Sequence, residues 1–170
     1  LSKQENVHSS YGCILVSGTF KSMPWYGTRN DGTRRIDTHI RWNVLPLLEQ
    51  FYDAIPDREG KLFIGFSKSG WGALSMILRG PAYFGYAAAW DSPWEMEYGR
   101  YGTADDFGSK ARFDTYDPKQ ILADRSDAVD DRERLWISAG RTFLRHHAPM
   151  VRRLTDLGIP HRARYLEVDE

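Results

Sequence analysis

The chain has 170 residues, of which 14% are aromatic, which predicts one folded domain over residues 1–170 and excludes a disordered chain. Lys plus Arg and Asp plus Glu number 23 each, so no overall charge favours nucleic acid or an anionic membrane as a partner. The apolar runs are too short to cross a bilayer, which predicts a soluble protein, either cytoplasmic or secreted.

The apolar run Tyr11–Val16 predicts a buried strand, and a loop rich in glycine and proline follows it over residues 17–27. In an α/β sheet, this loop would lie beside the loop at the end of a neighbouring strand. The backbone N–H groups of Thr19 and Phe20 are therefore candidates to stabilise an oxyanion. The alternative is a simple connecting loop.

A helix is predicted to begin at Asp37 or Thr38, because both residue types are good N-caps. Apolar residues then recur at helical spacing as far as Phe51. Pro46 lacks the N–H group that a helix interior needs, so we expect a kink or a restart there.

A second apolar run, Leu62–Ile64, predicts a buried strand, and an apolar helical pattern begins at Trp71. Residues 65–70 between them read Gly-Phe-Ser-Lys-Ser-Gly. A strand, a tight turn with a serine at its apex and a helix are the context that a G-x-S-x-G nucleophile elbow requires. The alternative is a serine-rich turn in another kind of α/β domain.

Ser67 is the candidate nucleophile because such a turn is crowded. The residues two before and two after the apex approach each other, so both must be small. With Ser67 at the apex, they are Gly65 and Ser69. With Ser69 at the apex, the later one would be Trp71, which is too large. The N–H group of Lys68, at the start of the predicted helix, is the expected first oxyanion donor.

The next strand is predicted over Phe84–Trp90, and Asp91 follows its carboxyl end directly. Residues 95–113 are rich in glycine, tyrosine and acidic residues and show no clear period. We expect this segment to be an inserted excursion over the site. A short helix is predicted around Ile121 and Leu122.

Three elements end the chain: Leu135–Ala139 predicts a strand, Ala148–Leu157 a helix, and Arg162–Val168 a last strand. Strands that alternate with helices predict the α/β class. We expect a mostly parallel sheet flanked by helices, arranged as a three-layer sandwich.

Several aromatic residues fall on segments that converge on the side of the predicted elbow, where they could line an acyl or aromatic substrate pocket. They are Trp25, Tyr26, Trp71, Trp90 and Trp94. Core packing is the alternative, and we favour it for Trp71 and Trp90. Because tryptophans also line sugar sites, a carbohydrate ester stays among the candidate substrates.

The order of these motifs resembles an α/β-hydrolase, and in particular its esterase D-like, putative-esterase branch. The most specific parts are the turn at residues 65–70 and the Leu-Gly-Ile-Pro-His step at residues 157–161, before the last strand. The resemblance covers residues 11–168. It implies a serine hydrolase that acts on esters through an acyl-enzyme, without a metal or a cofactor.

The sequence departs from that family at two places. The family's acid usually lies in a G-x-x-D loop after the next-to-last strand, where this chain has Phe143. The family's histidine follows the last strand, and the sequence ends at Glu170, about where that loop would begin, so this histidine is not found. The family's first strands also have no counterpart before Tyr11. We therefore expect a chain shortened at both ends, with an unpaired sheet edge. Such an edge predicts self-association, most simply as a two-fold homodimer.

A serine nucleophile needs a base, and the base needs an acid that orients it. Asp91 is the best replacement for the acid, with a cap of the Ser92-Pro93 turn as the equal alternative. His146 and His147 are the candidate bases, because they follow a strand at the right end of the sheet. The alternative, which we favour slightly, is that both face solvent at the start of a helix.

The other histidines are weaker candidates. His8 and His39 are expected at the surface, and His161 opens the last strand at the wrong end of the sheet.

Together, these patterns predict a carboxylic-ester hydrolase that acts on a small molecule. The alternative is a non-catalytic or truncated homologue that binds a ligand without turnover, which the missing acid and histidine favour. A peptidase or acyltransferase of the same fold is a weaker third reading.

Overall fold

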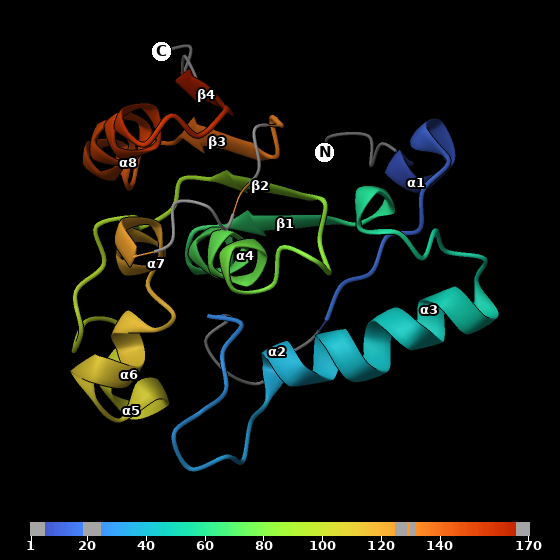
Figure 1. Ribbon diagram of the computed structural model, residues 1–170, viewed down its shortest axis with the longest axis horizontal. Coiled ribbons are helices and arrows are strands. Elements are labelled where there is room, and N and C mark those ends of the chain that lie inside the picture. The colour runs from blue at the N-terminus through green and yellow to red at the C-terminus, as the bar shows by residue number, and fades with distance from the viewer. Residues whose placement is uncertain (1–5, 19–24, 125–128, 130–131, 166–170) are drawn as a thin grey trace.

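The computed structural model describes residues 6–18, 25–124, 129 and 132–165. Its centre is a four-stranded sheet in which all neighbouring strands are parallel, in the order β1-β2-β3-β4 (Figure 1). The strands are β1 (Leu62–Phe66), β2 (Tyr86–Trp90), β3 (Leu135–Ala139) and β4 (His161–Tyr165). The prediction of an α/β fold with a parallel sheet is therefore confirmed.

Helices connect these strands, as a parallel sheet requires. The first half of the chain contains α1 (Val7–Tyr11), α2 (Ile36–His39), the π-helical turn η1 (Ile40–Val44), α3 (Leu45–Phe51) and the 3₁₀ turn η2 (Arg58–Gly60). The second half contains α4 (Lys68–Arg79), α5 (Thr103–Phe107), α6 (Lys110–Asp114), α7 (Pro118–Asp124) and α8 (Leu144–Asp156). Helix α4 packs against β1 and β2, α7 packs against α4, and α8 packs against β3.

The two faces of the sheet differ in what covers them. Alternate residues point to opposite faces of a strand. In β2 and β3, those that face α4 and α8 are buried, as Ala89 and Ile137 illustrate with 4% exposure each. Five apolar residues on the other face are 39–50% exposed: Leu62, Ile64, Phe66, Trp90 and Trp136. The described residues therefore cover one face and leave an apolar surface on the second. The expectation that Trp90 packs in the core is wrong, because this residue is 39% exposed. Trp71 is fully buried, as expected.

Pro46 lies in the first turn of helix α3, which begins at Leu45 directly after the wider π turn η1. A kink or a restart was predicted there, but the backbone stays helical through Val44 and Leu45. The structure therefore passes the proline by a change from a π turn to an α-helix. At the other end of this helical segment, Asp37 forms an ion pair of 2.9 Å with Arg79 of α4, which connects the segment to this helix.

The predicted strand at Tyr11–Val16 is wrong. Tyr11 ends helix α1, and Gly12–Gly18 has no regular structure. Tyr11, Ile14, Leu15 and Val16 are 46–79% exposed. A β-prone run forms a strand only where a neighbour accepts its backbone hydrogen bonds, and no described strand lies beside it.

The remaining differences concern element boundaries. Helix α8 begins at Leu144, earlier than the predicted Ala148, and β4 runs over His161–Tyr165, so residues 166–168 of the predicted last strand lie outside the described residues. Thr19 and Phe20 also lie outside them. No helix in the described ranges is long and apolar enough to cross a membrane.

The segment 95–113 contains more structure than its sequence suggests. It carries α5 and most of α6, and their aromatic residues enter the core. The ring of Phe113 stacks on Trp71 with centroids 5.8 Å apart, and Phe107 lies 6.3 Å from the same ring. This segment is therefore attached to the helix that follows Ser67.

Candidate active site

Ser67 lies in the turn between β1 and α4 with a strained backbone. Its φ of 53° and ψ of −122° are rare for a residue other than glycine, and such conformations cost about 1–3 kcal/mol. Its N–H group donates to the carbonyl of Trp90 on β2 at 3.0 Å. Its carbonyl accepts from the N–H groups of Gly70 at 3.1 Å and Trp71 at 3.2 Å. The neighbouring strand and the first helical turn therefore hold the strained residue in place.

The turn is as crowded as the sequence predicts. A Cβ atom at Gly65 would lie 2.1 Å from the carbonyl oxygen of Ser69, so only glycine fits there. A Cβ atom at Gly70 would lie 2.0 Å from Oγ of Ser92, at the end of the next strand. The close approach between the residues two before and two after Ser67 is thus a feature of this structure.

The two serines of the turn have different surroundings. The hydroxyl of Ser69 donates to the carbonyl of Phe66 at 2.7 Å and accepts from its N–H group at 2.9 Å. Ser67 is half-buried, and in the described part of the chain its hydroxyl caps no helical N–H group. Ser69 therefore stabilises the turn, while Ser67 lies directly after the carboxyl end of β1.

Asp91 connects two strand ends at the same edge. It follows β2, is 6% exposed and has a φ of 45°. Its carboxylate accepts from the N–H group of Phe143 at 2.7 Å and from that of Thr142 at 3.2 Å. These residues belong to the loop in which the resembled family carries its acid. The hydrogen bonds described for the Asp91 carboxylate thus go to this loop and not to the Ser92-Pro93 turn.

His146 is 9% exposed, and its two ring nitrogens have neighbours. The N–H group of Glu95 donates to Nδ1 at 2.9 Å, and Nε of Arg145 lies 3.3 Å from Nε2. Burial lowers the pKa of His146, and the positive charge of Arg145 lowers it further. Both effects disfavour the protonated imidazolium.

His147 is 1% exposed, and neither ring nitrogen has a hydrogen-bond partner among the described residues. Its ring packs edge-on against Tyr165 of β4, with centroids 4.8 Å apart. Burial lowers its pKa, and the nearby His161 lowers it further. Because both histidines are buried, the expectation that they face solvent is wrong. The earlier start of α8 places them inside the helix, on the side that packs against the sheet.

The described contacts do not join these groups into a triad. No hydrogen bond links His146 or His147 to Ser67 or Asp91 within the described ranges. The other histidines lie as predicted. His8 and His39 are exposed, and His161 begins β4 at the opposite edge of the sheet.

Trp25 and Trp94, the aromatic residues predicted to bind substrate, are 2% and 1% exposed and belong to the core. Trp25 packs edge-on against Trp71 at 5.2 Å, and its indole N–H has no partner among the described residues. The ammonium group of Lys68 lies 5.9 Å from the Trp25 ring centroid and 5.3 Å from that of Tyr101. Lys68 therefore places a charged side chain beside these two rings.

Sequence reasoning missed Tyr101. It lies in the segment 95–113, is 56% exposed and has a φ of 50°, with Gly99 and Gly102 beside it at φ 92° and 84°. The glycines on both sides are the signal that could have identified a turn displaying this ring.

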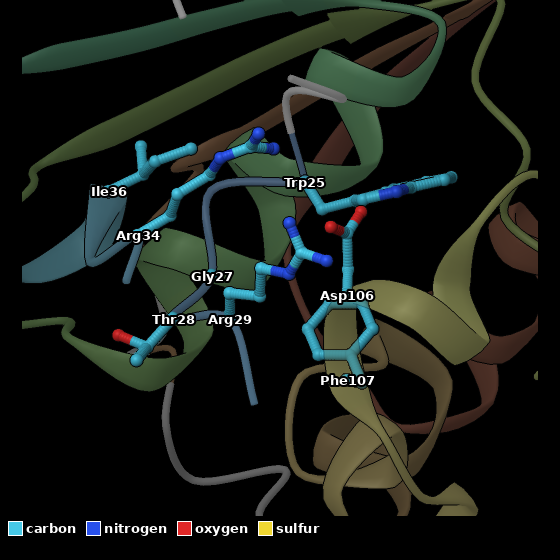
Figure 2. A pocket seen from close by; sticks show the side chains of 8 residues that line it. All are labelled: Trp25, Gly27, Thr28, Arg29, Arg34, Ile36, Asp106 and Phe107. Carbon is cyan, nitrogen blue, oxygen red and sulfur yellow. The ribbon is translucent and has the colours of Figure 1, made fainter. Parts of the chain in front are cut away.

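A small cavity of about 20 Å³ opens beside Trp25 (Figure 2). Arg29, Arg34 and Asp106 place charged groups around it, and burial raises the pKa of the Asp106 carboxyl against the effect of both arginines. This volume holds little more than one water molecule, so the cavity is too small for an ester substrate. The described residues contain no cluster of three or more metal-ligating side chains.

The fold is that of the α/β-hydrolases, and comparison with known proteins identifies the branch. The model of the family described as "Putative esterase" matches residues 9–150, so the chain belongs to this family. A search of curated proteins found no match. Both the matching family and the similar solved structures are those of esterase-type hydrolases.

Three solved structures illustrate the likeness. The Staphylococcus aureus fluorophosphonate-binding serine hydrolase FphF has 15% identity and a TM-score of 0.67, with 84% of this chain and 60% of that chain covered. An S-formylglutathione hydrolase from Agrobacterium tumefaciens has 17% identity and a TM-score of 0.68, with 84% and 54% covered. A ferulic acid esterase has 16% identity and a TM-score of 0.67, with 84% and 55% covered. The chain thus spans little more than half the length of these proteins, and the likeness shows the shared fold.

Proposed function

We propose that this chain hydrolyses carboxylic esters of small molecules and that Ser67 is the nucleophile. The observation that carries the proposal is the strained turn, because Ser67 keeps a φ of 53° in a crowded site where Gly65 tolerates no side chain. Strain of this kind persists where function requires it. A turn that served packing alone would place glycine at the apex.

The proposed reaction follows from this geometry. Oγ of Ser67 attacks the ester carbonyl carbon while a base accepts its proton, and the alcohol leaves with that proton. Water then attacks the acyl-enzyme, which releases the carboxylic acid and returns the proton to Ser67. The N–H group of Lys68 and the positive end of the α4 dipole stabilise the oxyanion that forms in both steps.

The base is proposed to be His146 or His147, and Asp91 the acid. Support comes from the parallel sheet, which brings the ends of β1, β2 and β3 to one edge. The lowered pKa of each histidine also suits a base, which must be neutral to accept a proton. In this role, a histidine side chain would turn from the helix–sheet interface toward Ser67.

A second candidate function is ligand binding without turnover. Two observations favour it: the carboxylate of Asp91 is engaged by two backbone N–H groups, and the ring of His147 packs against Tyr165. A serine without a base loses several orders of magnitude in rate. Such a chain would keep the turn and the oxyanion site but release its ligand unchanged.

A p-nitrophenyl butyrate assay separates the two functions. For a hydrolase, Ser67→Ala should lower turnover at least about 1000-fold. Ser69→Ala is the matched control, because its hydroxyl bonds to Phe66, and it should cost stability more than turnover. Absence of turnover in the unmodified chain would leave ligand binding as the function. Equal losses in both variants would contradict Ser67 as the nucleophile.

A further inference from the structure

Two side chains connect the ends of β2 and β3 in opposite directions. The N–H group of Glu95, in the segment that follows β2, donates to Nδ1 of His146 in the first turn of α8 at 2.9 Å. The carboxylate of Asp91, directly after β2, accepts from the N–H groups of Thr142 and Phe143 in the loop after β3. Each strand end thus supplies a side-chain acceptor to the backbone of the other.

The bond from Glu95 determines where the proton of the neutral His146 ring lies. A neutral imidazole has one nitrogen that accepts a hydrogen bond and one that carries the proton. Because Nδ1 accepts from Glu95, the proton lies on Nε2. Nε of Arg145, 3.3 Å from Nε2, is a second donor, but its side chain is exposed and can turn into solvent. An imidazolium ring would direct an N–H group at each of these donors, so the geometry also disfavours the protonated form.

Glu95 cannot follow the ring if His146 moves. Its Oε1 accepts from Nη1 of Arg153 at 2.9 Å, about two helical turns farther along α8. Its Oε2 lies 3.8 Å from Nζ of Lys119, at the start of α7. Lys119 also donates to the carbonyl of Met96 at 2.8 Å. The residues around Glu95 are therefore attached to α7 and α8 by contacts that do not involve the imidazole.

The two histidines differ in what a turn toward Ser67 would break. For His146, the turn breaks the hydrogen bond from Glu95 and removes the acceptor that the structure describes for this N–H group. For His147, it ends the ring contact with Tyr165, but neither ring nitrogen has a hydrogen bond to lose among the described residues. A general base needs an acceptor nitrogen that can face the proton it takes. His147 meets this requirement without the loss of a described hydrogen bond, and His146 does not.

The segment that begins with Glu95 reaches the candidate nucleophile. Its Tyr101 ring centroid lies 5.3 Å from the ammonium group of Lys68, the residue after Ser67. The end of the segment packs on α4 through its aromatic rings, and its start is held on α8 by the contacts of Glu95. Release of the start should therefore displace Tyr101 and affect where a substrate binds.

We propose that His146 is a positioning residue, held by Glu95 as the tautomer with its proton on Nε2, and that His147 is the base of the proposed function. His146 fixes the start of the segment 95–113 to α8 and acts on the substrate through the placement of this segment. The assignment of His147 rests on the proposed function, whereas the tautomer of His146 does not.

Proton–nitrogen NMR of the unmodified chain tests the tautomer without turnover. Long-range spectra at about pH 7.5, above the ordinary pKa of histidine, should show Nδ1 of His146 without a proton and Nε2 with one. The signals are assigned by their absence from the His146→Asn variant. A proton on Nδ1, or an imidazolium ring at this pH, would overturn the proposal.

Two variants of His146 separate a positioning residue from a base. His146→Leu removes the acceptor for the Glu95 N–H group and should raise KM for p-nitrophenyl butyrate about tenfold, with a smaller change in kcat. In His146→Asn, an amide oxygen takes the place of Nδ1 but cannot act as a base, and most of the loss should be restored. His147→Gln should instead lower kcat at least about 100-fold.

The outcomes distinguish this proposal from the proposed function. A loss of kcat in His146→Asn as large as that expected for His147→Gln would overturn the positioning role of His146. Full turnover in His147→Gln would overturn the assignment of the base. Absence of turnover in the unmodified chain would refute the hydrolase and the role of His147 together, while a proton on Nε2 of His146 would still support its connection to Glu95.

Discussion

At the end of β1, local contacts determine the conformation of the serine, whereas at the end of β3, distant contacts determine the positions of the histidines. Ser67 is held by hydrogen bonds to Trp90, Gly70 and Trp71, all next to it in the sheet or the helix. His146 and His147 are held by Glu95 and Tyr165, which belong to other elements. The candidate nucleophile can thus be positioned by two neighbouring strands, one turn and one helix. Its base requires the correct placement of several segments.

Gly65→Ala should have the largest effect, because it disrupts the locally determined region. The new Cβ atom would lie 2.1 Å from the carbonyl oxygen of Ser69, so the backbone must move. Ester turnover should fall at least about 1000-fold, and the free energy of unfolding by about 3 kcal/mol. Turnover assays and denaturant unfolding measure the two effects.

Gly99→Ala is the control for this substitution. Unlike Gly65, Gly99 is at positive φ, 92°, and nothing lies within 4 Å of its Cβ position. The substitution should cost about 1 kcal/mol and leave the turn intact. If the two alanine variants behaved alike, crowding at Gly65 would not explain the conformation of Ser67.

The turn at Ser67 and the histidines also differ in how well the sequence predicted them. The turn was predictable because its constraints act between residues two to four positions apart, so Gly65, Ser67 and Ser69 indicate it when an apolar strand precedes and an apolar helical pattern follows them. Burial of His146 and His147 was not predictable, because it depends on where α8 begins. The strand predicted at Tyr11–Val16 was wrong for a similar reason. A strand forms only beside a neighbouring strand, and that neighbour lies elsewhere in the sequence.

Replacement of the catalytic base should have the next largest effect. His146→Gln and His147→Gln, made separately, should identify it through a loss of about 100- to 10,000-fold in turnover for one of the two. Burial lowers the pKa of both histidines, so the base is neutral above about pH 6.5 and becomes protonated only below it. kcat/KM should therefore be level above this pH and fall on the acid side.

The lowered pKa of His147 also predicts how the stability of the fold depends on pH. A histidine whose folded pKa is lowered binds fewer protons than in the unfolded chain, so stability declines as pH falls below about 6.5. His147→Gln should weaken this decline in denaturant titrations. If both variants kept full turnover and an unchanged pH profile, neither histidine would be the base.

Asp91→Asn should have a smaller effect on turnover. The substitution separates the proposed role of Asp91 as the catalytic acid from its role as an anchor for the loop after β3. The amide retains an oxygen that can accept from Phe143 or Thr142 but loses the negative charge that would orient a histidine. Turnover should fall about 100-fold, and stability by about 1–2 kcal/mol. A loss of stability with unchanged turnover would reduce Asp91 to an anchor for the loop after β3.

The smallest expected effect concerns the face of the sheet that the described residues leave uncovered and the edge of β1, beside which no described strand lies. Leu62, Ile64 and Phe66 are 46–50% exposed there, and such surfaces favour self-association. We expect a homodimer in light scattering and a shift toward the monomer in Ile64→Lys, with little change in turnover per chain. A monomer at all accessible concentrations would contradict this prediction.

The central claim is that Ser67, and not Ser69, is the nucleophile of this turn. Treatment with a fluorophosphonate followed by peptide mapping tests it most directly, because the reagent adds to activated serines and the adduct can be assigned to a single residue. The account predicts one adduct, on Ser67, that is absent from the Ser67→Ala variant and unchanged in Ser69→Ala. An adduct on Ser69, or ester turnover without an adduct on any serine, would contradict it.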